Sequence, residues 1–140
     1  MPNVLLVPKR LKLQSAEELW RQGTVEHPLI SLPPTESVSR QFRAGLRRLR
    51  VDWPMRMEAS SLDLITRYVA NGYGIGVSVS DGEVVRHPQV KVLELPGFAP
   101  IVIAAFWQGS PSPLLQEILG EMKQYAARVW PTWGCEEAIK

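Results

Sequence analysis

Residues 58–77, EASSLDLITRYVANGYGIGV, contain the pattern of a helix that leads directly into a strand. Leu62, Ile65 and Val69 recur at helical spacing, so they are expected to lie on one buried face. Gly72 follows the last of them and can take the left-handed conformation that ends many helices. The stretch therefore predicts a helix that stops at about residue 71.

Strand patterns lie on both sides of this helix. Residues 55–59 alternate between larger apolar and polar side chains, and residues 75–79 form a short run rich in apolar side chains. A strand, a helix and a second strand in this order are typical of a βαβ unit, whose strands are parallel. We therefore expect an α/β fold with a mainly parallel sheet and flanking helices.

Gly72, Gly74 and Gly76 raise the question of a phosphate-binding loop. In dinucleotide-binding folds the glycine motif follows a strand and opens a helix, so that the helix N-terminus faces the phosphates. Here the glycines follow a helix and open a strand, and their G-x-G-x-G spacing also differs from G-x-G-x-x-G. We reject the phosphate-loop hypothesis and expect the glycines to allow a turn and close backbone approach.

The remainder of the chain continues the alternation of strands and helices. Further strands are expected at 4–7, 29–32, 90–95 and 101–107, and further helices at 15–22, 38–49 and 113–129. The last helix has the broadest apolar stripe, formed by Leu114, Ile118, Met122, Tyr125 and Val129. So wide a stripe needs a substantial partner surface.

The expected helix at 38–49 has two contrasting faces. Val38, Phe42, Leu46 and Leu49 form its apolar stripe, whereas Arg40, Arg43, Arg47 and Arg50, with Arg48 beside them, lie opposite. Such an arginine stripe could bind phosphate or an acidic partner. More often it is the solvated face of an amphipathic helix, and we favour that interpretation.

Composition limits the class of protein. With 140 residues, of which 45% are hydrophobic, the chain is long enough for one globular domain, and its net charge of +2 is too small to indicate nucleic-acid binding. Cys135 is the one cysteine, so no internal disulfide framework is possible. No apolar run approaches the roughly 18 residues of a membrane span, and the opening sequence lacks the pattern of a secretory signal. We expect a cytoplasmic protein.

No pattern of catalytic residues is found in the sequence. His27 and His87 are each followed by proline and lie 60 positions apart, without clustered cysteines or carboxylates, so a metal site is not predicted. A G-x-S-x-G nucleophile motif is also missing. We therefore predict no catalytic residue, no cofactor and no metal, and we do not expect an enzyme.

Several motifs in a fixed order resemble those of one family. The motifs are HPLI at 27–30, the quoted stretch at 58–77 and SPSPLL at 110–115, with an arginine-bearing helix between the first two. Their order and spacing resemble the effector-binding region of LysR-type transcriptional regulators over about residues 4–129. This resemblance rests on the whole set, because no single motif is diagnostic.

The resemblance implies a periplasmic-binding-protein-like (type 2) fold, in which two α/β subdomains hold a small-molecule effector between them. Residues 1–130 would be a partial effector-binding domain, with the second subdomain at 8–100, the returning strand and C-terminal helix at 101–130, and a tail at 131–140. The family's winged helix-turn-helix and most of its first subdomain have no counterpart in this sequence.

Hydroxyl side chains gather at two expected strand-to-helix junctions. Free backbone N–H groups and the positive helix end suit such junctions to a carboxylate or another anion, and the resemblance places both junctions at the effector cleft. The candidate ligand-binding residues are Pro34, Thr35, Glu36, Ser37, Ser60 and Ser61. The alternative is that the serines and the threonine are ordinary N-caps, each stabilising its helix by about 1 kcal/mol.

The sequence thus favours an effector-sensing module of a LysR-type regulator. Its expected partner is a small anionic metabolite, bound weakly or not at all by this chain alone. DNA would be reached only through a winged helix-turn-helix that this chain lacks. We also expect a homo-oligomer that covers the apolar face of helix 113–129. The alternatives are a fragment of a solute-binding protein from a transport system and an oligomerisation scaffold without a ligand.

Overall fold

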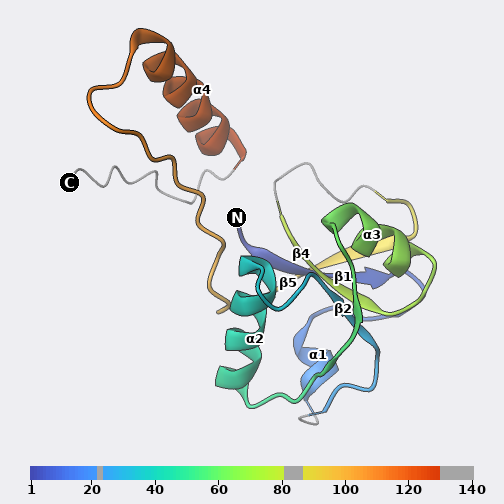
Figure 1. Cartoon of the computed structure of the whole chain (residues 1–140). Helices are drawn as coiled ribbons and strands as arrows, with labels where there is room; N and C mark the ends of the chain where they lie inside the picture. The colour runs from blue at the N-terminus through green and yellow to red at the C-terminus, as the bar shows by residue number, and fades with distance from the viewer. Residues whose placement is uncertain (22–23, 81–86, 130–140) are drawn as a thin grey trace.

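The computed structural model describes residues 1–21, 24–80 and 87–129, and its body is built on one five-stranded sheet (Figure 1). The strands are β1 (Asn3–Pro8), β2 (Leu29–Ser31), β3 (Met55–Glu58), β4 (Ile75–Val79) and β5 (Val90–Glu94), in the order β3-β2-β4-β1-β5. The helices are α1 (Glu17–Trp20), α2 (Ser37–Leu49), α3 (Leu62–Ala70) and α4 (Pro113–Val129).

The sheet is mixed. β2 pairs in parallel with β3 and with β4, whereas β1 pairs antiparallel with β4 and with β5. β2, β3, β4 and β5 therefore share one direction, and β1 runs against them between β4 and β5. The expected α/β fold with flanking helices is confirmed. The position of β1 was not predicted, because an apolar run does not reveal the direction of its neighbours.

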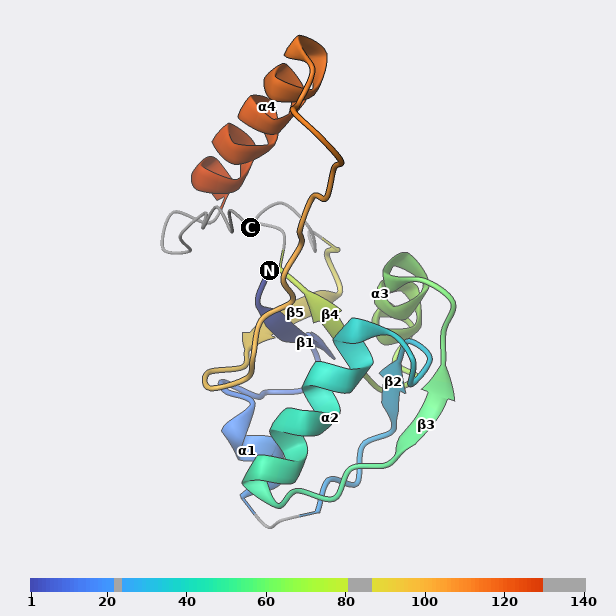
Figure 2. The same ribbon diagram turned by 60° about the vertical axis from the view of Figure 1, so that its left-hand side comes forward.

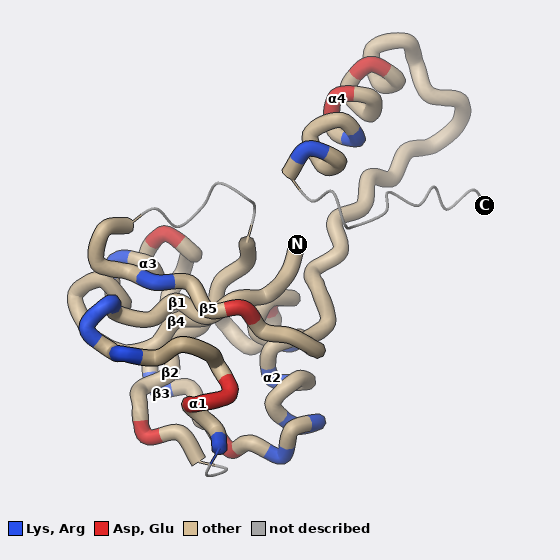
Figure 3. The backbone as a smooth tube through the Cα atoms, turned by 180° about the vertical axis from the view of Figure 1, so that it is seen from behind, with Lys and Arg blue, Asp and Glu red and all other residues tan. Residues whose placement is uncertain are grey.

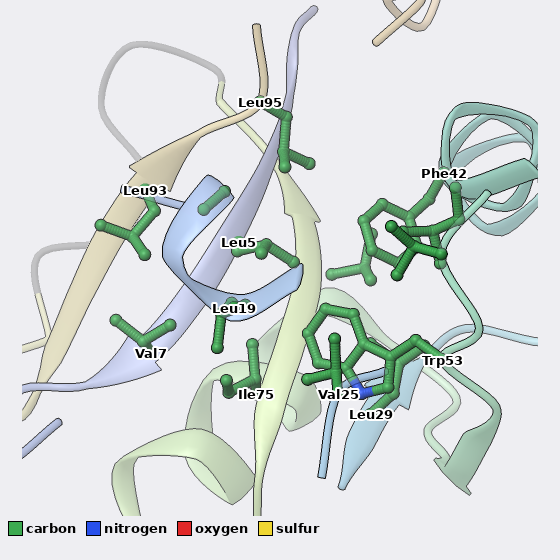
Figure 4. Packing of buried hydrophobic residues seen from close by; sticks show 14 of the residues in the cluster. Leu5, Val7, Leu19, Val25, Leu29, Phe42, Trp53, Ile75, Leu93 and Leu95 are labelled. Carbon is green, nitrogen blue, oxygen red and sulfur yellow. The ribbon is translucent and has the colours of Figure 1, made fainter. Parts of the chain in front are cut away.

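Helices cover both faces of the sheet (Figure 2). α1 and α2 pack on one face through a core that contains Leu5, Leu19, Phe42 and Trp53, and Figure 4 shows these side chains pointing toward one another. α3 packs on the opposite face. Its buried side chains meet a second, smaller cluster of apolar residues, which includes Val4, Leu6, Ile30, Ile65 and Val69.

The region around the quoted glycines agrees closely with its prediction. Ile65 and Val69 are fully buried, and Gly72 has φ of 80° just after α3, in the left-handed region. Gly76 passes directly beneath α3, where a Cβ atom would overlap Ile65 and would lie 2.8 Å from Cγ2 of Val69. A Cβ atom on Gly74 would overlap the carbonyl oxygen of Pro28. Gly74 therefore permits the close backbone approach that was expected, whereas the close contact at Gly76 is with side chains of α3 and not with backbone.

The two faces of α2 also lie as predicted, with one correction. Val38, Phe42 and Leu46 are buried, but Leu49 is 49% exposed, because it is the last residue of the helix and the chain turns away at Arg50, which has φ of 56°. Figure 3 marks several basic positions along α2. Arg40, Arg47, Arg48 and Arg50 are exposed, and Arg43 is half-buried.

Two sequence predictions fail in the connections. The expected strand at 101–107 is wrong: these residues pair with no strand in the described part of the chain, and Phe106 is 93% exposed. An apolar run favours a strand, but a strand also needs a neighbouring edge to pair with. The helix expected at 15–22 is shorter, since α1 begins at Glu17 and residues 22–23 lie outside the description.

α4 is a helix as predicted, but none of its residues is buried. It stands apart from the sheet at the end of an extended connector (Figure 1). The tail at 131–140, including Cys135, lies outside the described residues.

Candidate ligand-binding site

The two junctions singled out in the sequence lie side by side. β2 and β3 are parallel, with Ser31 opposite Glu58, so both strands end at the same edge of the sheet. Just beyond these ends the backbone N–H of Ala59 donates to the carbonyl oxygen of Ser31 at 3.0 Å. This bond ties the junction before α3 to the junction before α2. In open α/β sheets the carboxyl ends of parallel strands are where ligands usually bind.

The junction before α2 leaves the helix end without a side-chain cap. Glu36 occupies the cap position with an extended backbone, and its N–H closes a turn on the carbonyl oxygen of Pro33 at 3.0 Å. The Ser37 hydroxyl accepts a bond from Nη2 of Arg40 at 3.2 Å, and Thr35 has no side-chain bond to the described residues. Interpreting Thr35 or Ser37 as an N-cap is therefore wrong. The first-turn N–H groups of α2 remain available to an acceptor.

The junction before α3 is different, because one of its two serines is a cap. Ser61 has an extended backbone, and its Oγ accepts from the N–H of Leu64 at 3.2 Å. Ser60 is exposed and makes no side-chain hydrogen bond to the described residues. Of the hydroxyl groups proposed from the sequence, Ser61 has a structural role as a cap, while Thr35 and Ser60 have free hydroxyls at the same edge.

Two further serines at this edge were missed in the sequence. Ser31 and Ser39 are both buried, with their Oγ atoms 2.8 Å apart. Ser39 donates its proton to the carbonyl oxygen of Leu32 at 2.7 Å, so Ser31 must be the donor to Ser39. The pair fixes the start of α2 on the end of β2. The spacing of the sequence could have indicated that Ser39 is buried, since it lies on the same helix face as Phe42 and Leu46.

The candidate site is open on its outer side. Pro34, Thr35, Glu36, Ser37, Ser60 and Ser61 are all exposed. The carboxylate of Asp63, in the first turn of α3, is held by Arg67 at 2.9 Å. The edge thus presents free hydroxyl and backbone donors to one face of a ligand without enclosing it.

A separate hollow of about 400 Å³ lies near β5, the strand at the other edge of the sheet. Its lining includes Ser15, Glu17, Lys91 and Glu94. The Lys91 ammonium already donates to the carbonyl oxygen of Leu13 at 2.8 Å, and the two carboxylates would repel an anion. The β2–β3 edge also has a carboxylate, that of Glu36, but it offers an acceptor the uncapped N-terminus of α2 and the hydroxyls of Thr35 and Ser60.

Neither a metal site nor a membrane span is found in the described ranges 1–21, 24–80 and 87–129. No three His, Cys, Asp or Glu side chains there are grouped as metal ligands. No helix in those ranges is long and apolar enough to cross a bilayer.

Comparisons with known protein families and with solved structures point to the same family. Residues 2–127 match the profile of the LysR substrate binding domain. The structure is similar to the Synechocystis PCC6803 CcmR regulatory domain solved in complex with 2-PG, with a TM-score of 0.64 and 20% identity over 94% of this chain and 64% of that one. No curated protein matched the sequence.

Two LysR family transcriptional regulators share the fold at lower coverage. HinK from Pseudomonas aeruginosa gives a TM-score of 0.54 and 15% identity, and CbnR gives 0.56 and 10%. The matches cover 70% and 69% of this chain. In both cases the chain spans only 34% of the related protein, about a third of its length.

Proposed function

Because this chain belongs to the LysR substrate-binding domain family, we propose that it is the effector-sensing part of a LysR-type transcriptional regulator. The observation that carries the proposal is the shared edge of β2 and β3, where the N–H of Ala59 bonds to the carbonyl oxygen of Ser31. This bond ties together the two junctions that carry Thr35 and Ser60, and α2 and α3 begin just beyond them. The described residues include no winged helix-turn-helix, so contact with DNA would come from a separate domain.

The ligand proposed for this edge is a small anion. Helix N-termini carry partial positive charge and unpaired N–H donors, which favour carboxylates and phosphates. α2 has no side-chain cap to compete for its donors, and Ser60 is free to donate to a ligand oxygen. The CcmR regulatory domain, which shares the fold, was solved with 2-PG. The presence of a small ligand in that domain supports the proposal that this chain also binds a small molecule.

Sensing requires a second surface opposite this edge. An effector shifts an equilibrium between two arrangements only by its difference in affinity for them. All six candidate residues are exposed, so they can contact one side of a ligand. We propose that residues 8–100 form one subdomain of the sensor and that residues 101–130 lead back to the other. Binding by the 140-residue chain alone should therefore be weak.

The test is a titration of the labelled chain followed by amide NMR. The probes are inorganic phosphate, 2-PG and a set of small dicarboxylates, each compared with sodium chloride at equal ionic strength. The proposal expects saturable shifts for the amides of 35–38 and 60–62. Ser60→Ala should weaken the binding without unfolding the protein.

The start of α4 provides a matched control within the same chain. Ser112 caps α4 by accepting from the N–H of Leu115 at 3.2 Å, as Ser61 caps α3, and the other first-turn N–H groups of α4 remain available to an anion. It lies away from the sheet edge. Equal shifts at both helix ends would reveal a general effect of anions on helix termini. That result, or the absence of saturable shifts at 35–38 and 60–62, would contradict the proposed site.

A further inference from the structure

The outer edge of β5 is regular and has no partner strand among the described residues. β5 ends the sheet and pairs there only with β1, in one register over five residue pairs. β3, at the opposite end of the sheet, is less regular, because its register with β2 shifts between Leu29 and Ile30. A bulge makes an edge a poor template for a further strand, whereas a regular unpaired edge is a ready one. β5 is therefore the edge that another strand could extend.

The register shows which backbone groups of β5 face outward. The N–H of Lys9 donates to the carbonyl oxygen of Gln89 at 2.9 Å, and bonded positions alternate along an antiparallel pair. Counted from this bond, the odd-numbered residues of β5 bond to β1. The N–H and C=O groups of Val92 and Glu94 therefore point away from the sheet, and they bond to no residue in the described ranges.

The hollow of about 400 Å³ follows this edge. It is lined by residues 91–94 of β5 and by residues 14–17, which lead into α1. Successive side chains of a strand point to opposite faces of the sheet, so a hollow lined by four consecutive residues runs along the edge of the strand. Space for an incoming segment is therefore present beside the outward groups of Val92 and Glu94.

Acidic side chains dominate the charge of the hollow, and Figure 3 marks acidic positions on α1 and near β5. Glu17 and Glu94 line the hollow and are exposed. Glu18 adds a third carboxylate, which accepts from two backbone N–H groups just before α1 at 2.9 and 3.1 Å. Against these stands the ammonium of Lys91, which donates to the carbonyl oxygen of Leu13 at 2.8 Å. Three carboxylates and one ammonium favour a positively charged side chain.

The backbone groups of the edge distinguish a peptide from a small amine. An organic cation could bind the carboxylates and the outward carbonyl oxygens, but it would leave the N–H groups of Val92 and Glu94 without acceptors. An extended peptide supplies donors and acceptors in alternation. Its alternate residues are about 6.8 Å apart, which is the separation expected for Val92 and Glu94 in an antiparallel strand.

We propose that the outer edge of β5 binds an extended peptide segment of a partner protein. The segment pairs with the backbone of Val92 and Glu94 and places a lysine or arginine side chain in the hollow. This inference does not depend on the anion proposed for the β2–β3 edge, because β3 and β5 lie at opposite edges of the sheet.

The probes are six-residue peptides of alternating valine and threonine, blocked at both ends and fluorescently labelled. One central position carries lysine, arginine, glutamate or leucine. Fluorescence anisotropy measures their affinity for the 140-residue chain, and amide NMR locates the contact. The proposal expects saturable binding of the lysine and arginine peptides, at least fivefold tighter than binding of the glutamate peptide, with shifts at 91–94 and 14–17. N-methylation of alternate backbone nitrogens should abolish the binding.

Val92→Pro is the variant that tests the backbone pairing. It removes an outward N–H group without removing a bond to β1, and proline is tolerated at such positions of edge strands. Val92→Thr is the matched control, because it keeps the N–H group. The first substitution should weaken binding of the lysine peptide at least tenfold and the second by less than twofold. Should Val92→Pro not fold, as judged by circular dichroism, the N-methylated peptides test the same bonds on the original protein.

The charge of the hollow is tested by a second pair of variants. Glu94→Gln should weaken binding of the lysine peptide at least threefold. Glu117→Gln removes the same charge from α4 and should leave the affinity unchanged. Equal effects of the two substitutions would show a general effect of net charge and would contradict the placement of the basic side chain.

Three other results would overturn the proposal. The first is the absence of saturable binding by every peptide, and the second is equal binding of the N-methylated peptides. The third is that butylammonium chloride reproduces the shifts at 91–94, which would assign the hollow to a small cation. Sedimentation velocity covers the remaining occupant: self-association that Val92→Pro abolishes would assign the edge to a second copy of this chain and would equally overturn the proposal.

Discussion

The hydroxyl oxygens of Ser31 and Ser39 lie 2.8 Å apart in the interior, and the Ser39 hydroxyl donates a hydrogen bond to the carbonyl oxygen of Leu32. This short chain of bonds connects the end of β2 to the first turn of α2. Each group in it is an acceptor or donor that would otherwise be buried without a partner. The stability of the fold should therefore be sensitive to the loss of the Ser39 hydroxyl, which bonds to both other groups.

Ser39→Ala should lower the free energy of unfolding by about 1–3 kcal/mol, because it leaves the Ser31 hydroxyl and the Leu32 carbonyl without their partner. Urea denaturation followed by fluorescence measures the change. Ser37→Ala is the control, since Ser37 is exposed and bonded only to the Arg40 side chain. Equal effects of the two substitutions would show that the buried pair has no special role.

Gly76→Ala should lower the free energy of unfolding by about 1–3 kcal/mol through overpacking. The added methyl group would meet the side chains of Ile65 and Val69, which are both fully buried and have little room to move. Gly120→Ala is the matched control, because a Cβ atom at that helical position meets nothing within 4 Å. Denaturation midpoints should fall for the first variant alone. A neutral Gly76→Ala would mean that α3 can shift away from the sheet.

Ser60 and Ser61 are neighbours in sequence but should respond differently to replacement by alanine. Ser61→Ala removes the bond from the N–H of Leu64 and should cost about 0.5–2 kcal/mol of stability. Ser60→Ala removes no described bond, so its stability should change by less than about 0.5 kcal/mol. Thermal denaturation of both variants measures this difference. A larger loss for Ser60→Ala would mean that Ser60 has an intramolecular role.

The N-terminal ammonium gives a pH dependence with a definite sign. Burial lowers the pKa of the Met1 ammonium below its ordinary value of 8.0. The unfolded chain therefore binds more protons between the lowered pKa and 8.0, so the free energy of unfolding should rise with pH through that window and then level off. Denaturation midpoints from below to above pH 8.0 measure the rise.

Acetylation of the N-terminus is the control for this effect, because it removes the titrating group. The free and acetylated proteins should differ in the slope of stability against pH only within the same window. Identical slopes would contradict the assigned direction of the pKa change.

Much of the local structure could be predicted from the sequence. The helices α2 and α3 and the turn at Gly72 follow from patterns that extend over one or two turns. The spacing of Val38, Phe42 and Leu46 is sufficient to define the buried face of α2. These features are local because a residue's helical neighbours lie three and four positions away in the chain.

The candidate site was predictable only in part. Parallel strands followed by helices placed 34–37 and 60–61 at related positions, and the structure brings them to one edge. Which hydroxyl caps a helix was not predictable, because capping depends on the backbone angles of the cap residue and not on its type alone. The Ser31–Ser39 bond could not be predicted either, since it joins a strand to the helix packed against it.

The sequence by itself thus determined the helices and most strands. Only the tertiary structure decided that β1 lies antiparallel between β4 and β5, and that residues 101–107 remain unpaired. The physical reason is that helical hydrogen bonds close within four residues, whereas a strand's bonds belong to another segment of the chain. An apolar run can therefore favour a strand without specifying its direction or providing its partner.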